Sequence, residues 1–168
     1  EQKMDFQLVV LGSGSAELES HLKNLAEGSH GHGRICFLSG YDPTLANRVY
    51  SAGDFFLIPS RYEPCGLTDY IAQLFGNLPI VHQVGGLVKV VDGKTGFSYT
   101  TNTAASLLEA VQRAVAVAND DPQALRNMQK QAVQTILKTY TWKKVKDRYI
   151  TLYKKAIVQR NKVTGIII

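Results

Sequence analysis

Short runs of apolar residues alternate with helical patterns between Phe6 and Tyr99. Continuous apolar runs of this length are typical of strands that are buried on both faces of a parallel sheet. They occupy residues 6–11, 35–38, 55–58, 78–81 and 96–99. The helical patterns between them occupy residues 16–27, 42–52 and 67–75. This alternation predicts an α/β fold, a Rossmann-like open parallel sheet with helices on both of its faces.

Three longer helical patterns follow the last strand, at residues 103–119, 122–140 and 141 to about 159. Asp42-Pro43 and Asp121-Pro122 each place a capping side chain before a proline, which is a common start of a helix. We expect one domain over residues 1–160 and an apolar tail of unknown role over residues 161–168.

Composition and charge narrow the class of protein. With 45% apolar and 20% charged residues among 168, the chain has the composition of an ordinary globular domain. Much of the net charge of +5 comes from lysines and arginines after Trp142, which we interpret as a solvated helix face. No basic module with interleaved aromatic residues is present, so the sequence does not favour nucleic-acid binding.

The two cysteines make no disulfide framework, which indicates a reducing compartment such as the cytoplasm. Cys36 lies within an apolar run and is expected to be a buried thiol. No apolar run approaches the roughly 20 residues of a membrane span, and residues 1–5 do not resemble a signal peptide. The chain enters its first strand at once, as a piece of a longer protein would.

The most informative segment is Ser60-Arg-Tyr-Glu-Pro-Cys-Gly-Leu-Thr68, between a predicted strand and a predicted helix. Such a turn presents free backbone N–H groups and the positive end of a helix dipole, where phosphate binds readily. Glu63 stands at its lip and would repel phosphate, but it could accept hydrogen bonds from the hydroxyls of a sugar. The combination suggests a sugar nucleotide. The alternative is a capping turn with an incidental acid, but Glu63 precedes the turn by several residues, which is too early for an ordinary cap.

Three further loops follow the carboxyl ends of predicted strands, where ligands bind in open α/β sheets. Gly14 belongs to a glycine loop that is either a tight turn or a contact with a nucleotide. Tyr41 either stacks on a base or packs under the next helix. Gly85 and Gly86 suggest positive φ angles and bring the backbone close to a ligand or to another chain segment.

Other reactive side chains carry weaker signals. Cys65 has no histidine near it in sequence, so a backbone N–H in a tight site is a better interpretation than a nucleophile. His30 and His32 lack a third ligand and are interpreted as part of a polar loop, so no metal site is predicted. His82 follows a strand, and a satisfied or solvated ring is expected.

Taken in order, these motifs resemble the carboxyl-terminal domain of bacterial glycogen synthase and plant starch synthase, in glycosyltransferase family 5. The family's motifs correspond here to Leu11–Gly14, Gly40-Tyr41, Pro59–Thr68, Val84–Leu87, Thr95–Phe97 and Thr141-Trp142. The decapeptide from Pro59 is specific, and the match extends to about residue 157. The resemblance implies the two-domain GT-B fold and ADP-glucose-dependent, retaining synthesis of α-1,4-glucan, with no cofactor beyond the donor.

The resemblance also implies roles for single residues. Tyr41 would stack on the adenine, and Glu63 would bind hydroxyls of the donor glucose as the catalytic-site acid. Backbone N–H groups would contact the sugar and Thr68 the distal phosphate, while a glycine pair borders the same cleft. The backbone N–H groups that would contact the sugar are those of Cys65, Gly66 and Leu67. The two glycines that would border the cleft are Gly85 and Gly86.

Three departures from the family pattern leave alternatives open. Val84 replaces a threonine, Asp69 replaces a glutamine, and Val88-Lys-Val-Val91 replaces Ala-Asp-Thr-Val. They suggest a divergent member, or a nucleotide-sugar-binding module without activity. A family 4 transferase with another donor is a further alternative, but its second glutamate would fall at Ile71.

By the same resemblance, the acceptor site and the basic residues that hold the diphosphate lie outside this chain, in an amino-terminal domain and just upstream of residue 1. We therefore expect the partners of this chain to be ADP-glucose, α-1,4-glucan and that amino-terminal domain. We expect no glucose transfer by the chain alone. The expected compartment is the bacterial cytoplasm, or a plastid in a plant.

Overall fold

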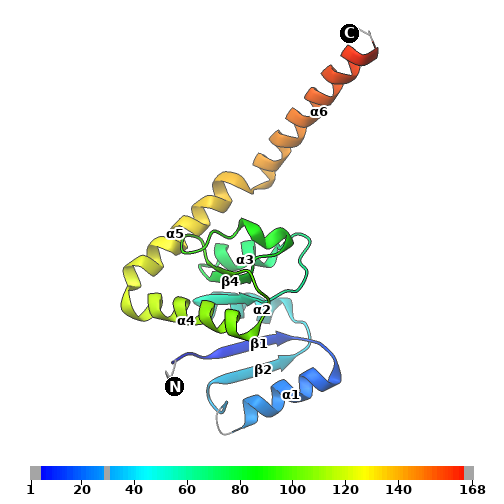
Figure 1. Ribbon diagram of the computed structural model, residues 1–168. Helices are drawn as coiled ribbons and strands as arrows, with labels where there is room; N and C mark the ends of the chain where they lie inside the picture. The colour runs from blue at the N-terminus through cyan, green and yellow to red at the C-terminus, as the bar shows by residue number, and fades with distance from the viewer. Residues whose placement is uncertain (1–4, 29–30, 165–168) are drawn as a thin grey trace.

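The computed structural model describes the backbone of residues 5–28 and 31–164 and the side chains of residues 5–28 and 31–161 (Figure 1). Strands and helices alternate, as predicted, up to the fifth strand. The elements are β1 (Leu8–Gly12), α1 (Ala16–Glu27), β2 (Ile35–Ser39), α2 (Pro43–Ala52), β3 (Phe55–Ile58), α3 (Thr68–Leu74), β4 (Leu78–His82), the 3₁₀ helix η1 (Gly85–Lys89), β5 (Phe97–Tyr99), α4 (Ala104–Asp120), α5 (Pro122–Thr139) and α6 (Trp142–Thr164).

All strand pairings are parallel, and they form two ladders. β1 pairs with β2, with Leu8 opposite Ile35. β4 pairs with β3 on one side and with β5 on the other. Parallel sheets with helices on both faces confirm the predicted fold class. The difference from the prediction is that no ladder joins β1 to β3 within the described part of the chain.

Local capping explains where the helices begin. The Asp42 carboxylate accepts hydrogen bonds from the N–H groups of Thr44 and Leu45, and Pro43 occupies the first helical position. Asp121 caps Ala124 in the same way at the start of α5. Both predicted Asp-Pro starts are therefore confirmed.

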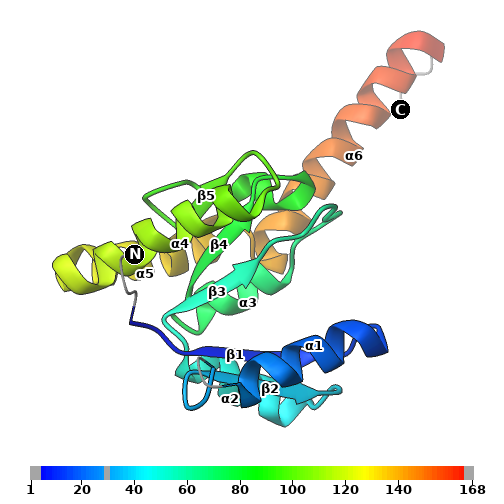
Figure 2. The ribbon, with the colours of Figure 1, turned by 60° about the horizontal axis from the view of Figure 1, so that its bottom comes forward.

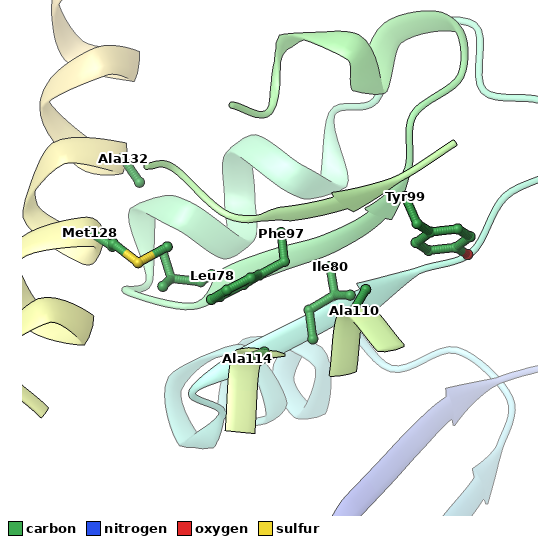
Figure 3. Close-up of a cluster of buried hydrophobic side chains, with 8 residues drawn as sticks. All are labelled: Leu78, Ile80, Phe97, Tyr99, Ala110, Ala114, Met128 and Ala132. Carbon is green, nitrogen blue, oxygen red and sulfur yellow. The ribbon is translucent and has the colours of Figure 1, made fainter. Parts of the chain in front are cut away.

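The main core lies between the three-stranded sheet and helices α4 and α5 (Figure 3). Leu78 and Ile80 point from β4 toward Ala110 and Ala114, whose small side chains let α4 approach the sheet. Val81 points to the opposite face, in a second cluster with Leu87 of η1. β4 is thus buried on both faces, as its continuous apolar run predicts.

The β1–β2 unit is much less covered. Neither α1 nor α2 contains a buried residue. Cys36 is exposed, so the prediction of a buried thiol is wrong. Its side chain alternates with those of Ile35 and Phe37, and nothing in residues 5–28 and 31–164 buries the face on which it lies.

The last helix extends away from the body of the domain (Figures 1 and 2). α6 reaches Thr164, several residues beyond the predicted end near 159. The tail at 165–168 lies outside the described residues. Among the helices that are described, none has the length and apolar character to cross a membrane.

Candidate functional site

The predicted signature forms a turn between β3 and α3 in which Glu63 is a structural acceptor. Its Oε1 accepts a hydrogen bond from the Gly66 N–H at 3.0 Å, and its Oε2 accepts one from the Ser60 hydroxyl at 3.4 Å. Gly66 has a φ of 65°, which favours glycine. Glu63 thus bonds within the turn, but, as predicted, it stands too early to cap α3, whose N-cap residue is Leu67.

The two glycines of η1 fit against this turn. A Cβ on Gly85 would lie 2.0 Å from the carbonyl oxygen of Glu63, and one on Gly86 would lie 2.1 Å from that of Cys65. The Gly86 N–H donates to the Glu63 carbonyl at 2.8 Å. Of the two close approaches that the glycine pair predicts, the structure shows the one to another chain segment. Gly85 has a positive φ of 51°, but Gly86 does not.

Lys89, at the end of η1, fastens the same turn to α3. Its Nζ donates to the carbonyl oxygens of Cys65, at 2.6 Å, and Gly66, and lies 3.3 Å from Oδ1 of Asp69. It also lies 3.9 Å from the ring centroid of Tyr70. One ammonium group therefore joins the two segments, through carbonyl groups, a carboxylate and an aromatic face.

Asp69 is fully buried, with 0% of its surface exposed. Neither carboxylate oxygen receives a geometrically satisfactory hydrogen bond, so the ion pair with Lys89 is its principal compensation. Burial raises the pKa of Asp69 to about 6, while the neighbouring ammonium opposes that rise. The signature turn thus rests on a carboxylate whose charge is costly in this position.

The other signature residues face solvent. The side chains of Cys65, Leu67 and Thr68 are exposed. Leu67 is the N-cap of α3 and provides no side-chain hydrogen bond there. A ligand can therefore approach the start of α3 from the open side. Two surface hollows, on α2 and on α5, contain none of these residues.

Tyr41 lies in the loop after β2 and is 84% exposed. The alternative in which Tyr41 packs under α2 is wrong, because its ring is exposed. The start of α2 is instead capped by the side chain of Asp42, which accepts hydrogen bonds from backbone N–H groups of the helix. An exposed aromatic ring is available for stacking on a flat ligand.

Sequence reasoning missed Glu19, a residue in the first turn of α1 whose carboxylate bonds to the glycine loop before that helix. Its Oε1 accepts from the Gly14 N–H and its Oε2 from the Ser39 hydroxyl, both at 2.8 Å. The Gly14 N–H, followed by the Ser39 hydroxyl, lowers the pKa of Glu19. The signal was an acid in the first turn of a helix that follows a glycine loop. In this conformation Gly14 offers its N–H to a carboxylate of the chain itself.

His82 has a structural explanation. Its Nδ1 lies 2.7 Å from the Ser60 carbonyl oxygen, its Nε2 lies 3.2 Å from that of Thr100, and its ring stacks on Tyr99. The expectation of a satisfied histidine is confirmed. His30 lies outside the described residues. Among those that are described, no three His, Cys, Asp or Glu side chains are grouped so as to hold a metal ion.

Known sequences are similar to this chain over most of its length. Residues 1–117 match the family model described as "Glycosyl transferases group 1". Glycogen synthase of Desulfitobacterium hafniense is 37% identical over 157 residues, and that of Vibrio vulnificus is 36% identical over 162. These matches cover 89% and 92% of the chain but 32% of each relative. The chain therefore spans about a third of the length of the curated relatives it matches.

Solved glycosyltransferase structures are similar to this chain over most of its length. The catalytic domain of starch synthase IV from Arabidopsis thaliana, bound to ADP and acarbose, superposes with a TM-score of 0.76 at 25% identity. The superposition covers 90% of this chain and 32% of that one. Sucrose-phosphate synthase from Thermosynechococcus elongatus superposes with a TM-score of 0.69 at 25% identity, over 91% and 39% of the two chains.

Proposed function

Since the chain belongs to the group 1 glycosyl transferases, we propose that it is the donor-binding part of an ADP-glucose-dependent glycogen or starch synthase. The full-length protein would transfer glucose, with retention of its configuration, to the 4-hydroxyl end of an α-1,4-glucan. The observation that carries the proposal is the turn around Gly66, where an acid and the start of α3 lie together on an open face. Relatives named glycogen synthase support this choice of reaction.

Each residue in the turn has a proposed role. Glu63 binds hydroxyls of the donor glucose, and in doing so exchanges its bond from Gly66 for bonds from the sugar. The N–H groups of Cys65, Gly66 and Leu67 then face the sugar, and Thr68 contacts the distal phosphate. Donors fixed in advance around a leaving diphosphate are typically a large term in catalysis.

The adenine and the glycine loops complete the donor site. The exposed ring of Tyr41 stacks on the base, for which the usual range is about 1–3 kcal/mol. Gly85 and Gly86 border the sugar and pack against the backbone of the turn at Glu63 and Cys65. Gly14 reaches the nucleotide only after Glu19 releases its N–H.

The chain alone is proposed to be inactive. An amino-terminal domain would contribute the acceptor site, and its closure over the donor would exclude water. No metal or cofactor is required in this scheme, because the basic residues of the missing part neutralise the diphosphate.

Two alternative functions, a non-catalytic binding module and a family 4 transferase, can be separated from this proposal. A non-catalytic module would accumulate unrelated changes at the site, but two of the three departures, Asp69 and Lys89, contact each other. A family 4 transferase would use a different donor. A panel of nucleotide sugars, tested on the full-length protein with glycogen as acceptor, separates this case from the ADP-glucose enzyme.

Calorimetry on the 168-residue chain tests the donor assignment. We expect weak binding of ADP, weaker binding of UDP, and a further loss of ADP affinity in Tyr41→Ala. Tyr153→Ala is the control, because Tyr153 is exposed on α6 and away from the loops. Unchanged affinity in Tyr41→Ala would remove the stacking role, and incorporation of radiolabelled glucose by the full-length protein would still test the reaction.

A further inference from the structure

The peptide groups around Gly66 are held from one side, by η1. Nζ of Lys89 donates to the carbonyl oxygens of Cys65 and Gly66. The Gly86 N–H donates to the carbonyl oxygen of Glu63 at 2.8 Å. Both donors belong to η1, so this short helix binds three carbonyl groups of the signature turn. The backbone groups on the other side of the turn are left to face outward.

Those outward groups are two successive N–H bonds. The described backbone is trans throughout, and in a trans peptide group the C=O and N–H bonds point in opposite directions. Because Lys89 binds the carbonyl oxygens of Cys65 and Gly66, the N–H bonds of Gly66 and Leu67 point away from η1. The φ angles of Gly66 and Leu67 are 65° and −87°, and successive N–H groups in a turn of this kind form an anion-binding concavity.

One of the two N–H groups is already used within the turn. The Gly66 N–H donates to Oε1 of Glu63 at 3.0 Å. Within residues 5–28 and 31–161, no acceptor bonds to the Leu67 N–H. The face opposite η1 therefore offers one donor that is engaged by an acid and one donor that is available to a ligand.

Lys89 itself has no donor to offer a ligand. Its side chain is 13% exposed, and an ammonium group has three N–H bonds. Around it lie the two carbonyl oxygens, Oδ1 of Asp69 at 3.3 Å and the ring of Tyr70, whose centroid is 3.9 Å away. The Tyr70 ring in turn stacks on Tyr140, with centroids 4.9 Å apart. Lys89 can therefore act on a ligand only through the turn that it holds.

We propose that Lys89 is a positioning residue of the donor site, which directs the N–H groups of Gly66 and Leu67 toward the bound nucleotide sugar without contacting it. The inference rests on the proposed function, since it takes the donor to bind on the face of the turn opposite η1. Without the ammonium group both carbonyl groups lose their donor, and a glycine between them does not restrict rotation of the peptide groups. A rotated peptide group would turn a carbonyl oxygen toward the diphosphate and repel it.

A second role for Lys89 has to be separated from this one. Lys89 is also the counter-ion of buried Asp69, so Lys89→Met alone changes stability as well as the turn. Asp69→Asn removes the buried charge and leaves Lys89 on the carbonyl groups. The informative comparison is therefore Asp69→Asn/Lys89→Met against Asp69→Asn as the reference. Asp69→Asn/Lys94→Met is the matched control, because it removes one charge from an exposed lysine.

The direction of the N–H bonds is measured without any ligand. Residual dipolar couplings of the 15N–1H groups report the orientation of each bond in the 168-residue chain. We expect the couplings of Gly66 and Leu67 to change in Asp69→Asn/Lys89→Met relative to Asp69→Asn. The couplings of β4 should stay the same, and Asp69→Asn/Lys94→Met should match the reference throughout. If Asp69→Asn/Lys89→Met fails to fold, Asp69→Leu/Lys89→Met replaces the pair by apolar side chains of similar volume.

Donor binding is measured by titrating ADP-glucose into the same proteins and following the amide resonances. We expect Asp69→Asn/Lys89→Met to bind about tenfold more weakly than Asp69→Asn, since charge-fixed donors are lost from the ligand. Urea unfolding is measured on the same preparations. If Lys89 were only a counter-ion, the double variant would match the reference in affinity, because the buried charge is absent from both.

Two results would overturn the proposal. They are unchanged couplings at Gly66 and Leu67 in Asp69→Asn/Lys89→Met, and an ADP-glucose affinity equal to that of Asp69→Asn. Absence of ADP-glucose binding by the parent chain would count instead against the proposed function. The couplings would then still decide whether Lys89 sets the direction of the two N–H groups.

Discussion

Nζ of Lys89 lies 3.3 Å from Oδ1 of Asp69, and both residues stand where the chain departs from the family pattern. The resemblance implies an acid at position 89 and a glutamine at position 69. The two departures therefore form one interaction, in which a buried carboxylate is paired with a cation. A carboxylate at 69 without a nearby cation would be an uncompensated buried charge.

Replacing Lys89 with methionine should destabilise the domain by about 3–5 kcal/mol at neutral pH, because the carboxylate of Asp69 is left buried without its partner. Asp69→Asn should cost less, since Lys89 keeps its bonds to the carbonyl groups of Cys65 and Gly66. Urea unfolding measures both. Lys94→Met is the control on an exposed lysine. Equal, small effects of all three changes would show that the pair contributes nothing.

Stability should fall as pH rises through the titration of Asp69. Folded Asp69 keeps its proton up to about pH 6, whereas the unfolded chain loses it near the ordinary pKa of 3.8. Because the folded state binds more protons in this window, the contribution is fully present below about pH 4 and is lost above about pH 6, a change on the order of 3 kcal/mol. Urea unfolding of the parent chain and Asp69→Asn across this range measures the difference. Parallel pH profiles would contradict the assignment.

Gly86→Ala should destabilise the domain by about 1–3 kcal/mol, the usual cost of overpacking. The new methyl group would lie 2.1 Å from the Cys65 carbonyl oxygen, and neither backbone segment can move without disturbing the signature turn. Gly12→Ala is the matched control, since its added Cβ would meet no atom within 4 Å. Thermal unfolding compares the two. Equal melting temperatures would mean that η1 does not press on the turn.

Local signals in the sequence predicted the fold well. The Asp-Pro starts of α2 and α5 and the apolar run of β4 depend on near neighbours or on a fully buried strand, and all three are confirmed. The exposure of Cys36 was not predictable in this way, because burial on both faces requires elements that cover the β1–β2 unit.

Within the site, the sequence identified the turn but not its internal contacts. The pairing of Lys89 with Asp69 joins residues twenty positions apart on different helices, and no single-sequence pattern encodes it. Glu63 was recognised as important, yet its bond to Gly66 depends on the positive φ of that glycine. Side-chain partners of this kind follow from the tertiary fold, and not from spacing.

Removing the charge of Glu19 should increase the affinity of the chain for ADP. In the free chain its carboxylate holds the Gly14 N–H and the Ser39 hydroxyl, where it would also repel a phosphate. Glu19→Gln keeps an acceptor for Gly14 but loses the charge. Calorimetry with ADP measures the change, and Glu27→Gln, at the far end of α1, is the control. Unaltered or weaker binding by Glu19→Gln would place the diphosphate away from this loop.

Two substitutions at Glu63 separate its structural role from its proposed role toward glucose. Glu63→Gln retains an oxygen that accepts from the Gly66 N–H, whereas Glu63→Ala leaves that N–H without its partner and should lower stability by about 1 kcal/mol. In the full-length protein, Glu63→Ala should abolish glucose transfer. Glu63→Gln should reduce it about 10–100-fold, because a neutral amide binds hydroxyls less strongly than a carboxylate.

Glucose transfer to glycogen and urea unfolding are measured on the same preparations, with Glu109→Gln as the exposed control on α4. A role limited to the turn predicts that activity follows stability, so that Glu63→Gln resembles the unmodified protein in both. A role toward the sugar predicts that Glu63→Gln is stable and slow. Near-normal turnover by Glu63→Ala would exclude contact between this carboxylate and the donor, and the acid would then serve only to hold Gly66 in the left-handed conformation.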